Sequence, residues 1–169
     1  MNRSRPSTTA RRALPRRGDP AARAIRELRR AIALIQAEGG TPARVTRNRA
    51  GELLRRLADL PVAMLVANNR GRYVDANAAA AVLTGYGHAE LLRRSVWDLT
   101  LDAHRGRGQA MWRAFLARGR MAGWYPLRRK SGRIVKARYV AIANVLPGLH
   151  VSVLATPAIV LRFERRRED

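Results

Sequence analysis

The hydrophobic and polar positions between residues 60 and 99 form a short series of well-marked segments. An uninterrupted apolar run at residues 62–67 has the length of a strand. The polar tetrapeptide at 68–71 ends this run, and residues 72–75 then alternate between polar and apolar. This pattern predicts strand, tight turn and strand, because Asn and Gly tolerate the positive φ that a hairpin turn requires.

A helix is predicted directly after this hairpin. Either Asp75 or Asn77 can cap it, residues 78–83 continue it, and Gly85 can end it. Its four consecutive alanines are small, so the helix can lie close against a sheet.

The second half of the chain predicts a longer helix and three more strands. Residues 101–117 have helical spacing, with Met111 and Phe115 four residues apart, and Gly119 can end that helix. Strands follow at residues 124–127, 134–145 and 149–154, separated by turns at 129–133 and 147–148.

The segments between residues 60 and 99 resemble the opening of a PAS domain. The resemblance rests on Gly71 in the hairpin, on the strand-to-helix junction at 75–79, on Thr84-Gly85-Tyr86 followed by Glu90-Leu91-Leu92, and on the short helix at 95–99. It implies an α+β fold, a five-stranded antiparallel sheet with helices on one face. Here an N-terminal helical extension is expected to precede that fold.

Four segments are expected along the chain. These are a disordered basic arm at 1–18, a helical extension of two helices at 19–58, the PAS domain at 59–156 and a short charged tail at 157–169.

The extension carries an apolar stripe with 4-3-4-3 spacing that includes Ile25, Leu28, Ile32 and Ile35. Such a stripe can pack on its own domain or on a second copy of itself. PAS domains often carry a flanking helix at a dimer interface, so the resemblance supports a homodimer.

Composition limits the kinds of functional site that the chain can contain. The chain has no cysteine, which excludes disulfides and thiolate ligands. No apolar run approaches the roughly 20 residues of a membrane span, and the start of the chain does not have the pattern of a secretory signal, so a cytoplasmic protein is expected. The three histidines lie too far apart to suggest a metal site, and no catalytic motif is present. We therefore expect neither a metal site nor an enzyme.

The net charge of +22 comes from 34 basic and 12 acidic side chains. It is spread over the chain rather than confined to a tail, so the surface should attract polyanions such as nucleic acid without base specificity. The alternative is that an arginine-rich genome raised the charge everywhere. Codon bias explains why arginine is more frequent than lysine, but it does not explain the small number of Asp and Glu residues.

PAS domains can hold haem, flavin or other small ligands between sheet and helices. The flavin adduct of light-sensing members needs a cysteine and is excluded here. His104 is the one candidate for a haem axial ligand, and a structural role for it is preferred. Cofactor identity thus stays open. A pocket would be lined by apolar side chains that serve equally well as a packed core, namely Met64, Val66, Leu83, Trp97, Met111, Phe115, Trp124 and Val153.

The expected function is that of a sensory or signal-transducing protein without an output domain of its own. It would bind a small ligand or a partner protein, in transcriptional regulation or two-component signalling, and pass its state to a downstream signalling protein. The alternative is a basic nucleic-acid-associated protein that uses the arginine-rich arm and the domain surface.

Overall fold

The computed structural model describes residues 62–156 continuously, together with single positions at 23, 26, 29, 30, 33, 51, 52 and 55. Within this range the side chains of residues 103–105 are not described. The predicted arm, the apolar stripe of Ile25, Leu28, Ile32 and Ile35, and the predicted tail lie outside the described residues. The prediction that the stripe forms a dimer helix therefore remains a prediction.

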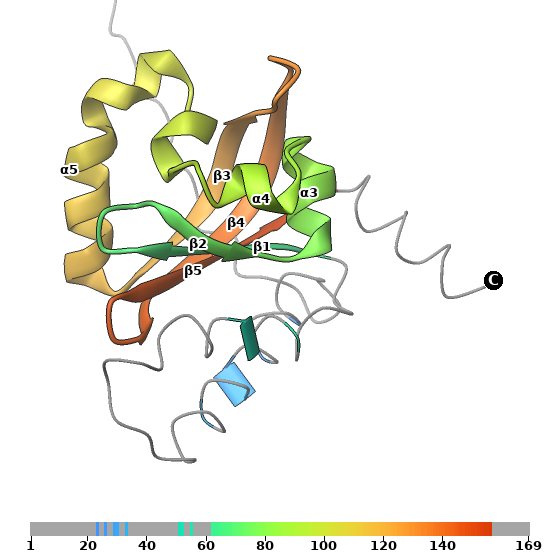
Figure 1. Ribbon diagram of the computed structural model, residues 1–169. Coiled ribbons are helices and arrows are strands. Elements are labelled where there is room, and N and C mark those ends of the chain that lie inside the picture. Colours follow the sequence, from blue (N-terminus) through green and yellow to red (C-terminus); the bar gives the residue numbers. More distant parts are fainter. Residues whose placement is uncertain are drawn as a thin grey trace, which may run out of the picture.

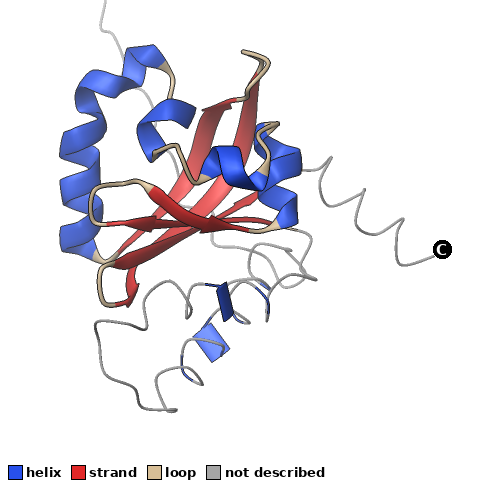
Figure 2. Cartoon of the chain, viewed as in Figure 1, coloured by secondary structure: helices blue, strands red, loops and turns tan. Residues whose placement is uncertain are grey.

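Five antiparallel strands form one sheet in the order β2-β1-β5-β4-β3 (Figure 1). Four helical segments connect the second strand to the third (Figure 2). The predicted α+β fold is confirmed. The strands are β1 (Ala63–Asn68), β2 (Tyr73–Ala76), β3 (Arg120–Arg128), β4 (Ile134–Leu146) and β5 (Leu149–Ala155), and the helices are α3 (Ala78–Thr84), α4 (His88–Leu91), the 3₁₀ helix η1 (Val96–Leu99) and α5 (Asp102–Arg118).

The β1–β2 hairpin closes through its polar tetrapeptide. The Asn68 side-chain oxygen accepts from the backbone N–H groups of Arg70 and Arg72, at 2.9 and 3.1 Å. Gly71 has φ 71° and donates its N–H to the Asn68 carbonyl at 2.8 Å. Asn at the start and Gly at the positive φ are what this turn requires, so the sequence pattern was sufficient here.

Asn77, rather than Asp75, caps α3, and it also ties the helix to the sheet. Its Oδ1 accepts from Ala80 N–H at 3.0 Å and from Met64 N–H at 2.9 Å, while its Nδ2 donates to the Val62 carbonyl at 2.9 Å. One buried amide therefore satisfies the helix N-terminus and two polar groups at the beginning of β1.

The second half follows the prediction with two differences. Helix α5 ends at Gly119, which has φ 73°. Strand β3 begins four residues earlier than predicted, at Arg120, because pairing with β4 extends it through residues with little intrinsic strand preference. Strand β4 is irregular between Ile142 and Leu146, where Asn144 has φ 51°.

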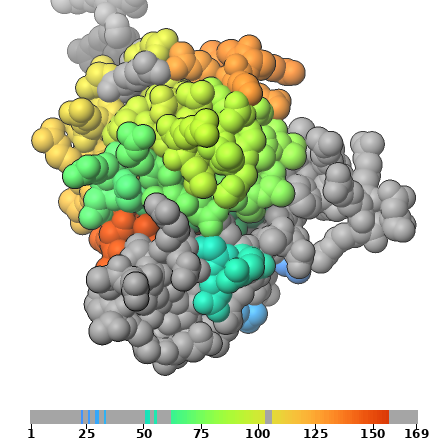
Figure 3. All heavy atoms as spheres, viewed as in Figure 1, coloured from blue at the N-terminus to red at the C-terminus, as the bar shows by residue number. Residues whose placement is uncertain are grey.

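The two faces of the sheet carry different apolar clusters. The inner cluster joins all five strands to the helices, and its members include Ala63, Leu65, Leu83, Leu91, Leu99, Leu127 and Leu154. The outer cluster lies on the opposite face and includes Val62, Met64, Val66, Val151 and Val153. Atoms of α3 and α4 lie over the middle of the inner face, while atoms of the β1–β2 hairpin and of the turns between β3, β4 and β5 are visible at its edges (Figure 3).

Candidate functional site

A cavity of about 260 Å³ lies between the inner face of the sheet and helix α5. All five strands of the sheet supply lining residues, and the helical side supplies η1 and α5. Met111 of α5 lines the cavity and is 47% exposed, so the cavity reaches the surface beside this helix.

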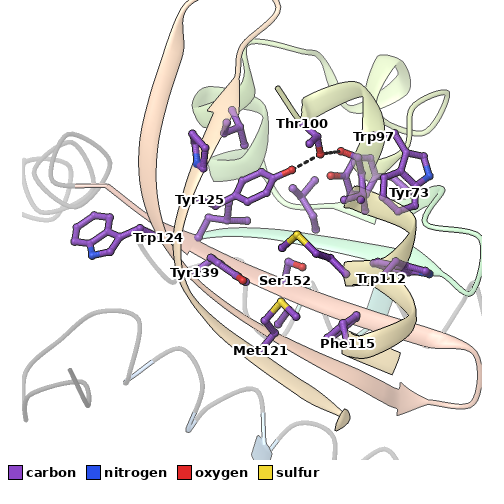
Figure 4. A pocket seen from close by; sticks show the side chains of 18 residues that line it. Tyr73, Trp97, Thr100, Trp112, Phe115, Met121, Trp124, Tyr125, Tyr139 and Ser152 are labelled. Atoms are coloured by element: carbon purple, nitrogen blue, oxygen red, sulfur yellow. Dashed lines mark hydrogen bonds between the residues drawn. The ribbon is translucent and has the colours of Figure 1, made fainter. Parts of the chain in front are cut away.

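Aromatic rings make up much of the wall (Figure 4). On the helical side Trp97 meets Trp112 edge to face, with ring centroids 6.0 Å apart, and Trp112 contacts Phe115 at 5.3 Å. On the sheet side Tyr125 and Tyr139 meet edge to face at 5.8 Å. Edge-to-face contact is a preferred arrangement of aromatic pairs, so neighbouring rings support one another's orientation.

Gly108 allows Trp97 to pack directly on α5. A Cβ atom at this position would lie 2.8 Å from Cζ3 of the Trp97 ring. Real Cβ atoms do not approach so closely, so any side chain at residue 108 would displace the ring.

Two hydroxyl groups form a hydrogen-bonded chain at one end of the cavity. Thr100 Oγ1 donates to the Val96 carbonyl at 2.8 Å, and it also contacts the Tyr125 hydroxyl (Figure 4). A carbonyl can only accept, so the single proton of Thr100 is committed to Val96 and Tyr125 must donate to Thr100. The Tyr125 oxygen is left with lone pairs that can accept a further hydrogen bond.

Burial keeps the phenol groups of the cavity protonated. It raises the pKa of Tyr125 above its ordinary value. The pKa of Tyr139 is raised by burial and, to a smaller degree, by Tyr125. Burial also raises the pKa of Tyr73 well above its ordinary value. All three hydroxyls therefore remain neutral hydrogen-bonding groups at ordinary pH.

His150 stands behind the aromatic wall and connects it to two turns. Its ring packs edge to face against Trp112 and Phe115, at 5.5 and 5.9 Å. Nδ1 accepts from Asn144 N–H at 3.0 Å, so the proton lies on Nε2, which donates to Asn69 Oδ1 at 2.9 Å. Burial lowers the pKa of His150, which favours this neutral form.

Among the eight predicted pocket residues, Trp97, Met111, Phe115 and Trp124 line the cavity. The Trp124 ring, however, points away from the cavity (Figure 4), is 58% exposed and lies 5.3 Å from the Lys136 ammonium group. Trp124 therefore lies at the edge of the cavity, with its ring outside.

The remaining four predicted residues do not line this cavity. Met64, Val66 and Val153 belong to the outer cluster, on the opposite face of the sheet, because the prediction did not resolve which alternate residues of these continuously apolar strands face the helices. Leu83 is on the correct side, but it is packed in the inner cluster and does not line the cavity. His104 falls within α5, and its side chain is not described.

Several polar wall residues were missed by the sequence analysis. Ser152 and Tyr139 could have been found, since Ser152 lies between Val151 and Val153 of the outer cluster and Tyr139 precedes Val140, which pairs with Val153. Thr100 is not part of an alternating strand pattern that could have identified it. It follows a short 3₁₀ helix, and the direction of that helix depends on tertiary contacts.

The described part of the chain offers little support for other kinds of site. No three His, Asp or Glu side chains there lie close enough together to hold a metal ion. None of the helices described is long and apolar enough to cross a lipid bilayer. The described cavity wall offers hydroxyls but no cationic side chain, so it does not fit a cofactor that needs its carboxylates or phosphates neutralised there.

Comparison with known proteins relates this architecture to a known family. A family model described as the PAS fold matches residues 57–145, more than half of the chain. A search of curated proteins gave no match.

Several solved structures superpose on the chain. A domain of a sensory box sensor histidine kinase/response regulator from Geobacter sulfurreducens has a TM-score of 0.54 at 16% identity, covering 64% of this chain and 96% of that one. A PAS domain from Colwellia psychrerythraea has a TM-score of 0.55 at 14% identity, covering 63% and 94%. An RNA-binding light-oxygen-voltage receptor has a TM-score of 0.53 at 22% identity, covering 77% of this chain and 39% of that one.

At these identities the superposed structures establish a shared fold and nothing more. They agree with the family model on the sheet and its helices. The chain belongs to the PAS fold family.

Proposed function

We propose that this protein is a sensory or signal-transducing module that responds to a small molecule bound between the sheet and α5. The single observation that carries the proposal is the cavity of about 260 Å³ whose wall combines aromatic rings with a few hydroxyl groups. Concave, mostly apolar sites with a small number of polar groups are typical of ligand pockets.

The wall is connected to surface elements through which a bound ligand can be detected. Trp112 lines the cavity and donates its Nε1–H to the backbone carbonyl of Asn69, at 2.9 Å. Asn69 in turn accepts from His150 at the beginning of β5. A ligand that moves Trp112 thus acts on the tip of the β1–β2 hairpin and on β5, at a distance from the cavity itself.

A screen of small ring compounds by thermal unfolding tests this proposal. A compound at about one hundred times its Kd stabilises the native state by about 2.7 kcal/mol, which raises Tm by several degrees. Ala141→Leu adds three carbon atoms to a residue that lines the cavity. Binders of the wild type should therefore raise the Tm of this variant little or not at all.

Ala122→Leu is the matched control, because Ala122 is an exposed residue of β3 and does not line the cavity. Binders should stabilise it as they stabilise the wild type. Equal stabilisation of Ala141→Leu would place the binding site elsewhere and contradict the proposal, as would a screen without any binder.

Binding of nucleic acid is a second candidate, favoured by the state of the acidic side chains. Each of the four between residues 62 and 156 already has a partner within the domain. Asp75 contacts His88, Glu90 contacts Lys130, Asp98 accepts from Ser95 and Asp102 contacts Arg128. The exposed arginines therefore present an excess of positive charge, among them Arg70, Arg72, Arg93, Arg107, Arg113, Arg118, Arg120 and Arg133.

A salt series separates this candidate from the first. Binding to arbitrary DNA or RNA that persists at physiological salt, and is lost when residues 1–18 are deleted, would support it. Binding that is seen at low salt but is lost before the salt concentration reaches its physiological value would mean that the charge gives only weak, non-specific attraction.

A further inference from the structure

We infer that the cavity takes an uncharged, flat molecule of one or two rings that carries a hydrogen-bond donor. This inference rests on the proposed function, and it names the chemical class of the ligand. Three independent features of the wall carry it.

The first feature is charge. Although 27% of the chain is charged, no described residue that lines the cavity is Asp, Glu, Lys, Arg or His. An ionised group placed there would lose its hydration without gaining a counter-ion, which is strongly unfavourable. The wall thus selects neutral molecules, in a protein whose outer surface attracts anions.

The second feature is shape. Rings from both sides of the cavity face one another, those of Trp97, Trp112 and Phe115 from the helices and those of Tyr125 and Tyr139 from the sheet. Flat ligands can stack on such rings or meet their edges. An apolar cavity of about 150 Å³ is known to bind benzene, so a cavity of about 260 Å³ has room for a second fused ring.

The third feature is the direction of the hydroxyl chain. Thr100 gives its proton to the Val96 carbonyl, and Tyr125 gives its proton to Thr100. At this end of the cavity the Tyr125 oxygen can only accept. A ligand with an N–H or O–H group can complete the chain, whereas one that lacks a donor leaves the lone pairs of Tyr125 without a partner.

Three probes of similar shape test these features by isothermal titration calorimetry at pH 8. Indole is neutral and carries an N–H donor, 1-methylindole has the same rings without the donor, and indole-3-carboxylate adds a negative charge. With the wild type we expect indole to bind about fivefold more tightly than 1-methylindole, the size of one neutral hydrogen bond. Indole-3-carboxylate should bind at least tenfold more weakly than indole.

The variant Tyr125→Phe removes the acceptor together with the hydrogen bond that Tyr125 donates to Thr100, while Thr100 keeps its bond to Val96. It should bind indole and 1-methylindole equally well. Tyr86→Phe is the matched control, because Tyr86 lies against Arg94, 4.3 Å from its guanidinium carbon, and does not line the cavity. This variant should keep the fivefold preference.

The outcomes separate the ligand class from the proposed function. Equal binding of indole and 1-methylindole to the wild type, or a preference that survives Tyr125→Phe, would overturn the donor requirement. Binding of the carboxylate as tight as that of indole would overturn the charge requirement. In these cases the cavity would still be a ligand site. Failure of all three probes would overturn the inferred class, and the wider thermal screen would then decide whether the cavity binds any ligand.

Discussion

At the scale of single residues, the shape of the cavity depends on small residues as much as on aromatic rings. Gly108 leaves the space that the Trp97 ring occupies, and Ala141 leaves space opposite α5. Polar atoms then fix how the elements meet, as Asn77 does between α3 and β1. Small changes at these positions should therefore have effects that are large compared with their chemical size.

Two glycines of the same helix provide a matched test of this view. At Gly106 a Cβ would meet no atom within 4 Å, so Gly106→Ala should stabilise the protein by up to about 1 kcal/mol through helix propensity. Gly108→Ala gains the same propensity but drives Trp97 from its place, at an overpacking cost of about 1–3 kcal/mol. Chemical denaturation should rank Gly106→Ala above the wild type and Gly108→Ala below Gly106→Ala. Equal stability of the two variants would show that Trp97 is not held by this contact.

His150 predicts a pH dependence of stability. Because its pKa is lowered in the folded protein, the unfolded chain binds the proton more readily once the pH falls below the ordinary histidine value of about 6.5. The free energy of unfolding should therefore be unaffected by His150 above that pH. It should decrease as the pH drops below 6.5, by at most about 1.4 kcal/mol per pH unit.

The variant His150→Phe provides the comparison. It is expected to be less stable throughout, since Asn144 N–H and Asn69 Oδ1 lose their partner. Denaturation curves at several pH values should show that the difference in stability between the two chains shrinks as the pH falls from 6.5. A constant difference would mean that His150 does not stay neutral in the fold.

At the scale of elements, the sequence predicted which segments form and in what order, but not all of their faces. The β1–β2 hairpin and the end of α3 were accessible because Gly71 and Gly85 mark positive φ. Strand β1 was not fully predictable, since its residues are apolar on both sides and either alternate set could face the helices. That choice is made by tertiary contacts, which is why the cavity wall was only partly identified.

Helix α5 and the β1–β2 hairpin are joined by the bond from Trp112 to the Asn69 carbonyl. Trp112→Phe keeps an aromatic ring but removes the donor, so the hairpin should open more often. Hydrogen exchange measured by mass spectrometry should become about fivefold faster at residues 68–72, the effect of one lost hydrogen bond. Trp124→Phe is the control, because that ring points away from the cavity (Figure 4), and exchange at the hairpin should not change. Unchanged exchange in Trp112→Phe would rule out this connection.

At the scale of the whole molecule, the proposed ligand site and the basic surface occupy separate parts of the domain. The cavity wall is neutral, whereas the exposed side chains carry the positive charge. Recognition of a small uncharged ligand and attraction of an acidic partner can therefore operate without competing. The family assignment fixes the fold of this domain, and the ligand and the partners remain the subject of the proposals above.

The expected homodimer is testable at this scale. We propose that the stripe of Ile25, Leu28, Ile32 and Ile35 pairs with a second copy. Replacing Ile25 and Ile32 with glutamate places charge on the stripe and should convert a dimer to a monomer in sedimentation equilibrium experiments. Glutamate at Arg23 and Arg26, which are exposed and off the stripe, is the control and should leave the dimer intact. A wild type that is monomeric at high concentration would contradict the proposal.

The most direct test of the ligand site is the response of the tryptophan side chains to indole, measured in a two-dimensional ¹H–¹⁵N NMR titration. The chain has three tryptophans, two with rings in the cavity wall and one, Trp124, with its ring turned away. We expect the Nε1–H signals of Trp97 and Trp112 to move to saturation in the wild type while that of Trp124 stays in place. None of them should move in Ala141→Leu. Movement of Trp124 alone, or movement of Trp97 and Trp112 to the same extent in Ala141→Leu, would contradict a ligand site between the sheet and α5.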